Sequence, residues 1–544
     1  MPDTRHAEVF APSGGPEMLR TRTSLGGMVT APHHLAAQAG RDVLRDGGNA
    51  VEAMIAAAAT IAVVYPHMNA IGGDGFWLIA EPGKDPVAIR ACGGAAGLAS
   101  PEFYRDLGHD KIPARGPLAA LTVGGAIGGW MEAAKIARKL GGTLPIARLV
   151  ADAVHHARTG VPITKSQHEL TRDKLPELLG APGYVAAYAA NGVPEIGDVL
   201  KQPALGATLE RLGSVGLDDF YRGDIARANA KGLEAVGSPL RLPDFEAYHA
   251  KTTTPLSVKL SSGTVFNMVP PTQGAASLMI LGLFDRLGVK AGEGFDHIHG
   301  VIEATKRAFI KRDAHIGDPG RMDIDPMSLL SDAMLGAEAA KIDMKTALPW
   351  PHIAKPGDTI WMGATDKNGT VVSYIQSIFW EFGSGVVVPE TGVLWQNRGA
   401  SFTLHDGPNQ LGPGRLPFHT LNPAMARLKN GDVLTYGTMG GEGQPQTQAA
   451  VFTRNVLFGQ DLQAAITAPR WLLGRTWGAE TTTLKLENRF DPALITQLEK
   501  AGHAVEVVGD FEDMMGHAGG ILLRANGVME GATDPRADGV VAAL

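Results

Sequence analysis

Residues 357–377 read GDTIWMGATDKNGTVVSYIQS, and the rest of the chain is interpreted around this stretch. Two runs rich in β-branched and aromatic residues flank the turn sequence KNG, a pattern typical of a β-hairpin. The preceding segment, ALPWPHIAKPGD, holds three prolines in twelve residues and favours neither a helix nor a central strand. By itself the stretch predicts a surface linker that enters a hairpin, with Thr359 at the start of the first strand.

The composition is that of a large globular protein. With 544 residues, of which 44% are hydrophobic and 19% charged, the chain predicts several domains or one large enzyme fold. Its formal net charge of −7 and the lack of a basic run argue against nucleic acid or a membrane as partner. The single cysteine, Cys92, excludes an intrachain disulfide and a cysteine-based zinc site. The longest apolar run, 53–65, predicts a buried helix, and without a recognisable secretory signal we expect a cytoplasmic protein.

Helical and strand patterns are segregated along the chain. Helices are predicted over 31–66, through most of 113–250 and over 295–319, and strands return at 256–260 and 264–269. Because helices and strands group together instead of alternating strictly, the pattern favours a layered α+β fold over a barrel or a doubly wound sheet.

Motifs for several other chemistries are absent. Neither the G-x-S-x-G elbow of serine hydrolases nor a phosphate-binding G-x-x-x-x-G-K-[ST] loop occurs. One predicted helix carries several residues of metal-ligating type, namely His297, His299, Glu303, Asp313 and His315. Side chains at positions i and i+2 of a helix point to different sides, so we predict no metal site there and no cofactor.

Segments spread from about residue 26 to residue 536 resemble one enzyme superfamily in their order. They include VVYPHMNAIGGDGFWL, PPTQGAASLMILGLFDRLG, the hairpin stretch, TMGGEGQPQ, APRW and GATDPR. Together they resemble the γ-glutamyltransferase superfamily of N-terminal nucleophile hydrolases. The resemblance implies a four-layer αββα sandwich, made as one precursor that cuts itself into two chains.

The resemblance also implies a nucleophile. Matching ATDKNG to the family places it on Thr359, so that the precursor is cut after Asp358. The products would be a large chain, 1–358, and a small chain, 359–544, which remain together as a heterodimer. The freed α-amine, with an intrinsic pKa of roughly 7.7–8.0, could act as general base for the hydroxyl of the same residue.

Further site residues follow from the same resemblance. Gly440 and Gly441 match the paired glycines that stabilise an oxyanion, although the pattern also suits a plain strand–helix turn. Ser377 matches a hydroxyl position near the nucleophile. Arg90 falls where the family has an arginine for the substrate's α-carboxylate, since its planar fork suits such a group; a surface arginine after a strand is the alternative.

The remaining pocket positions depart from typical transferases. They fall on Phe379, Arg398, Ser401, His419 and Thr420. Ser401 stands where the family has an aspartate that binds the donor's α-amine, so an ammonium group would lose its counter-charge. Arg398, at a glutamine position, favours anions instead. The pocket is therefore expected to recognise something other than glutamate.

Three functions stay open at this stage. QNRGASF, WMG and GGEGQPQ resemble the subgroup that includes oxamate amidohydrolase. The leading hypothesis is a self-processing threonine amidohydrolase acting on a small carboxylate-bearing amide, with oxamate giving oxalate and ammonia. The second is a γ-glutamyltransferase or glutathione hydrolase with an altered amine site. The third is an unprocessed, inactive relative that serves as a binding protein.

Overall fold

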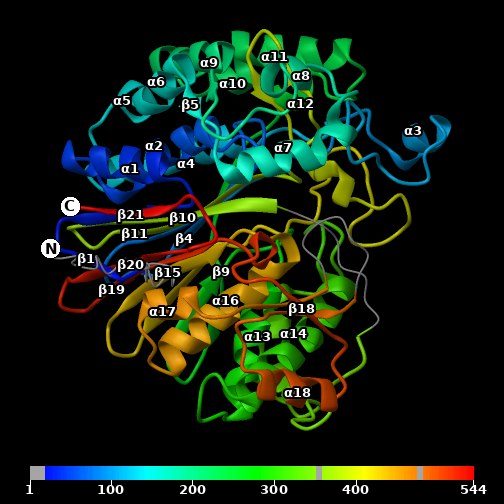
Figure 1. Ribbon diagram of the computed structural model, residues 1–544. Helices are drawn as coiled ribbons and strands as arrows, with labels where there is room; N and C mark the ends of the chain where they lie inside the picture. Colours follow the sequence, from blue (N-terminus) through cyan, green and yellow to red (C-terminus); the bar gives the residue numbers. More distant parts are fainter. Residues whose placement is uncertain (1–18, 351–357, 475–481) are drawn as a thin grey trace, which may run out of the picture.

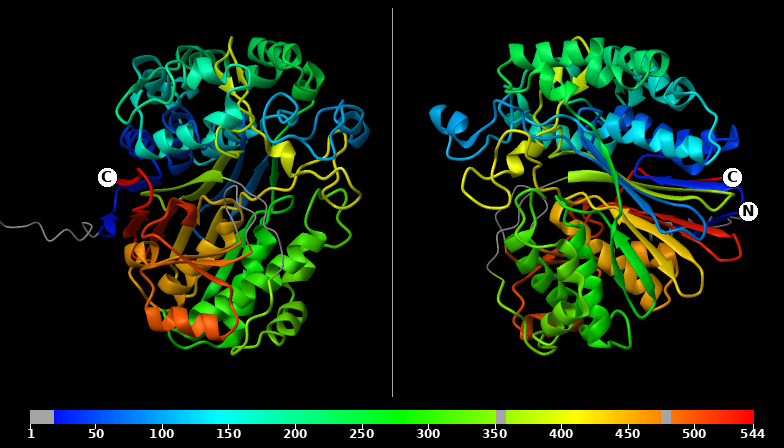
Figure 2. Two further views of the ribbon diagram at one scale, coloured as in Figure 1. Left: turned by 45° about the vertical axis from the view of Figure 1, so that its right-hand side comes forward. Right: turned by 180° about the vertical axis from the view of Figure 1, so that it is seen from behind.

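Two antiparallel sheets of seven strands each pack face to face, and helices cover the outer face of each sheet (Figure 1). The computed structural model describes residues 19–350, 358–474 and 482–544. Seen from behind, the sheets again lie between two helical layers (Figure 2). The mixed α+β architecture predicted from the segregated patterns is thereby confirmed.

The first sheet, called the β10 sheet, has the predicted hairpin at its centre. Its order is β21 (Val540–Ala543), β2 (Gly27–Ala31), β10 (Asp358–Asp366), β11 (Val371–Phe379), β3 (Asp74–Ala80), β4 (Val87–Ala91) and β7 (Lys251–Thr253). β10 pairs with β11 around a turn in which Gly369 has φ +83°, a left-handed conformation that glycine adopts without strain. The hairpin prediction is confirmed.

The second sheet, called the β15 sheet, faces the first. Its order is β1 (Arg22–Ser24), β20 (Met529–Thr533), β19 (Ala518–Leu523), β15 (Val433–Thr438), β14 (Ala424–Leu428), β9 (Gly263–Asn267) and β8 (Leu256–Lys259). The indole of Trp361 on β10 fills the space between the sheets, because glycines of the β15 sheet leave room for it. A Cβ atom on Gly437 would lie 2.2 Å from the Trp361 ring.

Helices from two parts of the chain form the outer layers. Those over the β10 sheet include α1 (His34–Arg45), α2 (Ala50–Val64), α4 (Ala126–Lys139), α6 (Ala151–Thr159), α7 (Lys165–Leu178), α9 (Pro203–Val215) and α11 (Asp224–Ala235). Those over the β15 sheet include α13 (Gly274–Leu287), α14 (Phe295–His315), α16 (Gln444–Phe452), α17 (Leu462–Thr467) and α18 (Pro492–Lys500). The shorter elements include α5 (Ile146–Leu149) and a small sheet of β16 (Trp471–Leu473), β17 (Leu484–Glu487) and β18 (Val505–Val508).

Helix α2 carries the longest apolar run and is buried on every side. All its residues lie between the β10 sheet and the outer helices, and Asn49 and Glu52 close its N-terminus in a capping box. This confirms the prediction of a buried helix. Among the described residues, no helix is both long and apolar enough to cross a bilayer.

Candidate active site

Thr359 lies near the start of β10 and is completely buried. Alternation of side chains along the strand places it on the same face as Trp361, whose indole packs in the cluster between the sheets. The bond from Asp358 to Thr359 lies within the described residues, whereas residues 351–357 of the predicted linker, 347–358, lie outside them. The candidate nucleophile therefore sits inside the precursor, at one end of the inter-sheet space.

The pairing of the hairpin is irregular at this point. Asp358 lies opposite Phe379 and Ile360 lies opposite Gln376, so two residues of β11 face Thr359. Such a bulge bends a strand and re-aims a side chain, and bulges are frequent next to active sites. The regular ladder resumes at Ile360 and continues to Thr365.

Ser377 and Phe379 end β11 beside the bulge. The hydroxyl of Ser377 accepts a hydrogen bond of 2.8 Å from the N–H of Phe379. Phe379 has φ +84°, a backbone conformation that costs a bulky residue on the order of 1–3 kcal/mol. Its ring lies under the guanidinium of Arg398, 3.9 Å away, so the strained turn supports a buried cation.

The glycine pair lies in the turn between β15 and α16. Gly440 and Gly441 are both buried and both left-handed, with φ +113° and +51°. The carbonyl of Gly440 accepts a hydrogen bond of 2.7 Å from Gly443. Within the described part of the chain, neither glycine donates its own N–H to another residue. Two adjacent buried N–H groups without acceptors are the arrangement that an oxyanion requires.

A buried polar group gathers around Arg398. Its Nη1 lies 3.5 Å from the hydroxyl of Thr420, and its Nη2 has no hydrogen-bond partner among the described residues. Asp74, opposite Ser377 in the sheet, accepts N–H groups from two loops through Oδ1. Its Oδ2 lies 3.4 Å from Nε2 of His419 without a hydrogen bond. Unsatisfied buried atoms of this kind mark a place that a polar ligand can fill.

Burial sets the protonation of these groups. It raises the pKa of Asp74 to about 7, against the opposing effects of Arg398 and two backbone N–H groups. It lowers the pKa of Arg398 to about 9, with Asp74 acting in the opposite direction. Burial, reinforced by the charges of Arg398 and Arg90, holds the pKa of His419 well below its usual range. At neutral pH, His419 is therefore an uncharged ring beside a cation.

Two predicted residues have other contacts. The hydroxyl of Ser401 donates to the carbonyl of Phe418, 2.9 Å away, so it holds a loop and supplies no counter-charge. Arg90, on β4, donates to the carbonyl of Pro270 and lines an open cavity of about 570 Å³ that also borders Lys251. Arg90 thus stands at the edge of the site, while Arg398 lies at its buried centre.

Comparison with known proteins places the chain in a family. The gamma-glutamyltranspeptidase family matches residues 36–544. The chain belongs to that family. It is 53% identical to the oxamate amidohydrolase proenzyme of Klebsiella pneumoniae, over 96% of this chain and all of the relative. It is 37% identical to the glutathione hydrolase-like YwrD proenzyme of Bacillus subtilis, over 95% and 98% of the two chains.

Solved structures agree with the family assignment. A cephalosporin acylase from Bacillus halodurans superimposes with a TM-score of 0.89 at 32% identity, covering 98% of this chain and 99% of the other. By sequence alone, the glutathione hydrolase proenzyme of Escherichia coli is 28% identical over 94% of this chain and 90% of the relative. This gamma-glutamyltranspeptidase-family chain therefore shares the fold of the cephalosporin acylase structure over nearly its whole length.

Asp74 is a site residue that the sequence analysis missed. It appeared only as part of a glycine turn, GGDG, before a strand. The signal available was an acidic residue at the head of an otherwise apolar strand, where a carboxylate is seldom buried without a partner. Its neighbours Arg398 and His419 come from segments more than three hundred residues away, so local patterns did not connect them.

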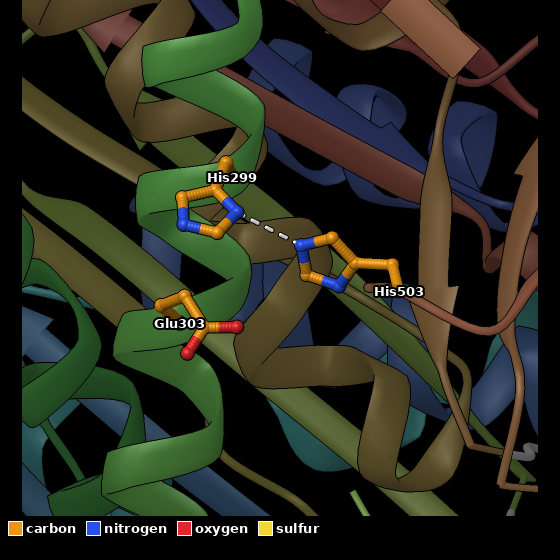
Figure 3. Close-up of side chains that lie close together, drawn as sticks. All are labelled: His299, Glu303 and His503. Carbon is orange, nitrogen blue, oxygen red and sulfur yellow. Dashed lines mark hydrogen bonds between the residues drawn. The ribbon is translucent and has the colours of Figure 1, made fainter. Parts of the chain in front are cut away.

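Two of the metal-ligating residue types on the helix predicted over 295–319 lie close to a third from elsewhere in the chain. His299 and Glu303 of α14 meet His503, a residue from the other end of the chain, with ligand atoms within 4.8 Å (Figure 3). Each of these atoms already has a partner. The histidines bond each other at 2.9 Å, and the Glu303 carboxylate binds the Lys306 ammonium at 2.7 Å and the N–H of Leu348 at 3.0 Å.

The Lys306 ammonium already neutralises the Glu303 carboxylate, and the donor set does not fit a second cation. These side chains instead hold the segment at 343–348, which precedes residues 351–357, against α14. Lys306 donates to the carbonyl of Leu348 at 2.7 Å, and His299 pairs with the carbonyl of Asp343 at 2.8 Å. We call His299, Glu303, Lys306 and His503 the stem cluster.

Proposed function

We propose that the chain is a self-processing threonine amidohydrolase that hydrolyses a small amide bearing a carboxylate, with oxamate the best-supported substrate. The observation that carries the proposal is the buried guanidinium of Arg398. It makes no ion pair within 4.0 Å with a described residue, and its Nη2 has no hydrogen-bond acceptor among the described residues. The 53% identity to an oxamate amidohydrolase proenzyme supports the same substrate.

The fold belongs to the four-layer αββα class of N-terminal nucleophile hydrolases. Two facing sheets with helices outside support this assignment, as does the family match over residues 36–544. The relatives are named proenzymes, and cleavage after Asp358 gives a large chain, 1–358, and a small chain, 359–544. The new α-amine of Thr359 then lies on the same residue as the hydroxyl that it deprotonates.

The chemistry follows from these groups. The Thr359 oxygen attacks the amide carbon, its proton passes to the α-amine, and the oxyanion takes hydrogen bonds from the N–H groups of Gly440 and Gly441. Each such donor contributes roughly 2.7–4 kcal/mol to the transition state in comparable enzymes. The carbon–nitrogen bond breaks, and ammonia leaves with the proton from the α-amine. Water then hydrolyses the ester, releasing oxalate and restoring Thr359.

The pocket selects the substrate by charge. Arg398 offers a donor to the carboxylate that adjoins the scissile amide, and a buried charge-assisted hydrogen bond of this kind is strong. Ser401 supplies no anion for an α-ammonium group, because its hydroxyl holds a backbone carbonyl. A γ-glutamyl donor would bring an ammonium group into a pocket that already holds a cation, which disfavours it.

An amide panel tests the proposal. Purified, processed protein is expected to release ammonia and oxalate from oxamate, and little from glutamine or glutathione. Because some relatives are named glutathione hydrolases, the alternative function is that of a γ-glutamyltransferase or glutathione hydrolase. Rapid turnover of a γ-glutamyl anilide would favour this alternative. A protein that stays full-length on a denaturing gel after long incubation would contradict both enzymes and point to an inactive binding relative.

A further inference from the structure

We propose that Gln273, held in place by Arg312, is a positioning residue that fixes the orientation of the Gly440–Gly441 loop for catalysis. The inference rests on the proposed function of that loop as an oxyanion site. It goes beyond it by naming the residues that keep the loop in shape. None of the comparisons or motifs described above gives these two residues a role.

Gln273 bonds the loop directly. Its Nε2 donates to the carbonyl of Gly441 at 2.9 Å and to the carbonyl of Thr420 at 2.7 Å. The side chain is completely buried, so neither hydrogen bond competes with water. One amide therefore ties the glycine loop to the segment that carries His419 and Thr420. The two parts of the candidate site cannot move apart without breaking these bonds.

Arg312, on α14, holds the other end of the amide. Its Nη1 donates to Oε1 of Gln273 at 2.9 Å, and its Nη2 donates to the Glu442 carboxylate at 3.0 Å. The guanidinium is nearly buried and stacks on the ring of Phe309 at 3.9 Å. Because Arg312 can only donate, it also fixes which end of the Gln273 amide faces the carbonyls. Arg312 thus grips the loop twice, through Gln273 and through Glu442.

The consequence concerns the backbone on both sides of Gly441. The hydrogen bond from Gly443 to the carbonyl of Gly440 fixes the peptide plane that carries the Gly441 N–H. The bond from Gln273 to the carbonyl of Gly441 fixes the next plane, so the dihedral angles of Gly441 are restrained from both sides. Glycine lacks a Cβ and would otherwise sample many conformations, so a pair of left-handed glycines needs such external restraint. Catalysis gains only if the donors are oriented before the oxyanion forms.

These hydrogen bonds also join the two chains that the proposed cleavage would produce. Gln273 and Arg312 belong to residues 1–358, whereas Gly441, Glu442 and Thr420 belong to residues 359–544. The large chain therefore holds the oxyanion loop of the small chain. A short backbone pairing supports this contact, since Gln273 donates its N–H to the carbonyl of His419 at 3.0 Å.

The test replaces Gln273 in the processed enzyme. Gln273→Met keeps the length of the side chain and removes both hydrogen-bonding ends, and kcat for oxamate is expected to fall at least roughly tenfold with KM changed less than about twofold. Gln273→Glu retains an acceptor for Arg312 but sets a carboxylate oxygen against two carbonyls. It is expected to lose as much or more. A role limited to supporting Arg312 would leave Gln273→Glu active.

Gln202→Met is the matched control. Gln202 is a buried glutamine that donates to a backbone carbonyl, that of Val63 at 2.7 Å, in the helical layer over the β10 sheet. Its replacement removes a similar bond far from the loop and is expected to leave kcat within about twofold of the unsubstituted protein. An equal fall of kcat in both variants would mean a general loss of stability and would overturn the positioning role.

Hydrogen exchange gives a readout that needs no substrate. Peptides that cover 438–445 are expected to exchange faster in Gln273→Met than in the unsubstituted protein or in Gln202→Met. If the unsubstituted enzyme is active and Gln273→Met changes neither kcat nor exchange, the inference is wrong. If no amide is hydrolysed but exchange rises in Gln273→Met alone, the proposed function fails while the positioning of the loop stands.

Discussion

At the residue scale, the proposed mechanism assigns the nucleophile and the general base to Thr359, and a single substitution tests the assignment. Thr359→Ala removes the nucleophile and is expected to abolish cleavage, leaving one band of 544 residues on a denaturing gel. Intact mass spectrometry checks the result, since the unsubstituted protein should give chains of 358 and 544 − 358 = 186 residues. Thr365→Ala, on the same strand, should still be cleaved. Cleavage after Asp358 in the Thr359 variant would refute the assignment.

The raised pKa of a second residue, Asp74, predicts that folding stability and the KM for oxamate depend on pH. Burial raises its pKa from 3.8 to about 7, so its contribution to folding stability is fully present below pH 3.8 and is lost as the pH rises through about 7. The groups that face it are Arg398, His419, Cys92, the side chain of Gln396 and two loop N–H groups, and His419 stays uncharged. Ionised Asp74 also compensates Arg398, so the KM for oxamate is expected to rise above about pH 7.

The variant Asp74→Asn tests whether Asp74 causes this pH dependence. The variant has no carboxylate to ionise, so both its unfolding free energy and its KM should vary less between pH 5 and 8, measured by urea denaturation and by initial rates. A KM profile that keeps the same slope in Asp74→Asn would assign the titration to another group.

At the scale of elements, local sequence predicted the β10–β11 hairpin and the glycine turn because both depend on neighbouring residues. The turn residues of KNG and the left-handed glycines each determine a few dihedral angles. The helix predicted over 295–319 ends at His315, because the chain turns extended at Ile316 before a Gly-Asp-Pro sequence. Within the stretch 113–250, where helices are predicted, one helical segment is interrupted at Val150, between α5 and α6.

Contacts between distant segments could not be predicted in this way. The local sequence around Asp74, Gln273 and His503 does not identify their partners, and their roles arise only where the fold brings separate segments together. His503 is the clearest case, since it completes a group begun two hundred residues earlier on α14. The residues placed by family resemblance, such as the glycine pair, are those to which the resemblance assigns a role. Asp74 and Gln273 lie inside two of the resembling segments, VVYPHMNAIGGDGFWL and PPTQGAASLMILGLFDRLG, but these segments do not show which distant side chains the two residues meet.

The stem cluster gives a prediction about α14 and α18. Lys306 and Glu303 are each 2% exposed, so Lys306→Met leaves a buried carboxylate without its counter-charge and should destabilise the fold by roughly 3–5 kcal/mol. Chemical denaturation of the processed protein measures this. The double variant Glu303→Gln, Lys306→Met should recover much of the loss, because it buries no uncompensated charge. Lys135→Met, at an exposed pair with Glu132, is the control and should change little.

At the scale of the whole molecule, the strands of the two proposed chains alternate through both sheets. In the β10 sheet, β10 and β11 of the small chain lie between β2 and β3 of the large chain. In the β15 sheet, β1 and β9 of the large chain flank four strands of the small chain. Separation would break backbone ladders in both sheets and expose the core between them, so the halves cannot come apart while either stays folded.

We therefore expect the cleaved protein to remain a single species. It should elute from size-exclusion columns with both chains in equal amounts, and unfold in one cooperative transition, followed by circular dichroism in urea. The chains should separate only under denaturing conditions. The uncleaved Thr359→Ala protein is the control, and its native elution volume should match that of the cleaved protein. Free small chain in native buffer would contradict the interleaved arrangement, because β10 and β11 would then lack both of their neighbouring strands.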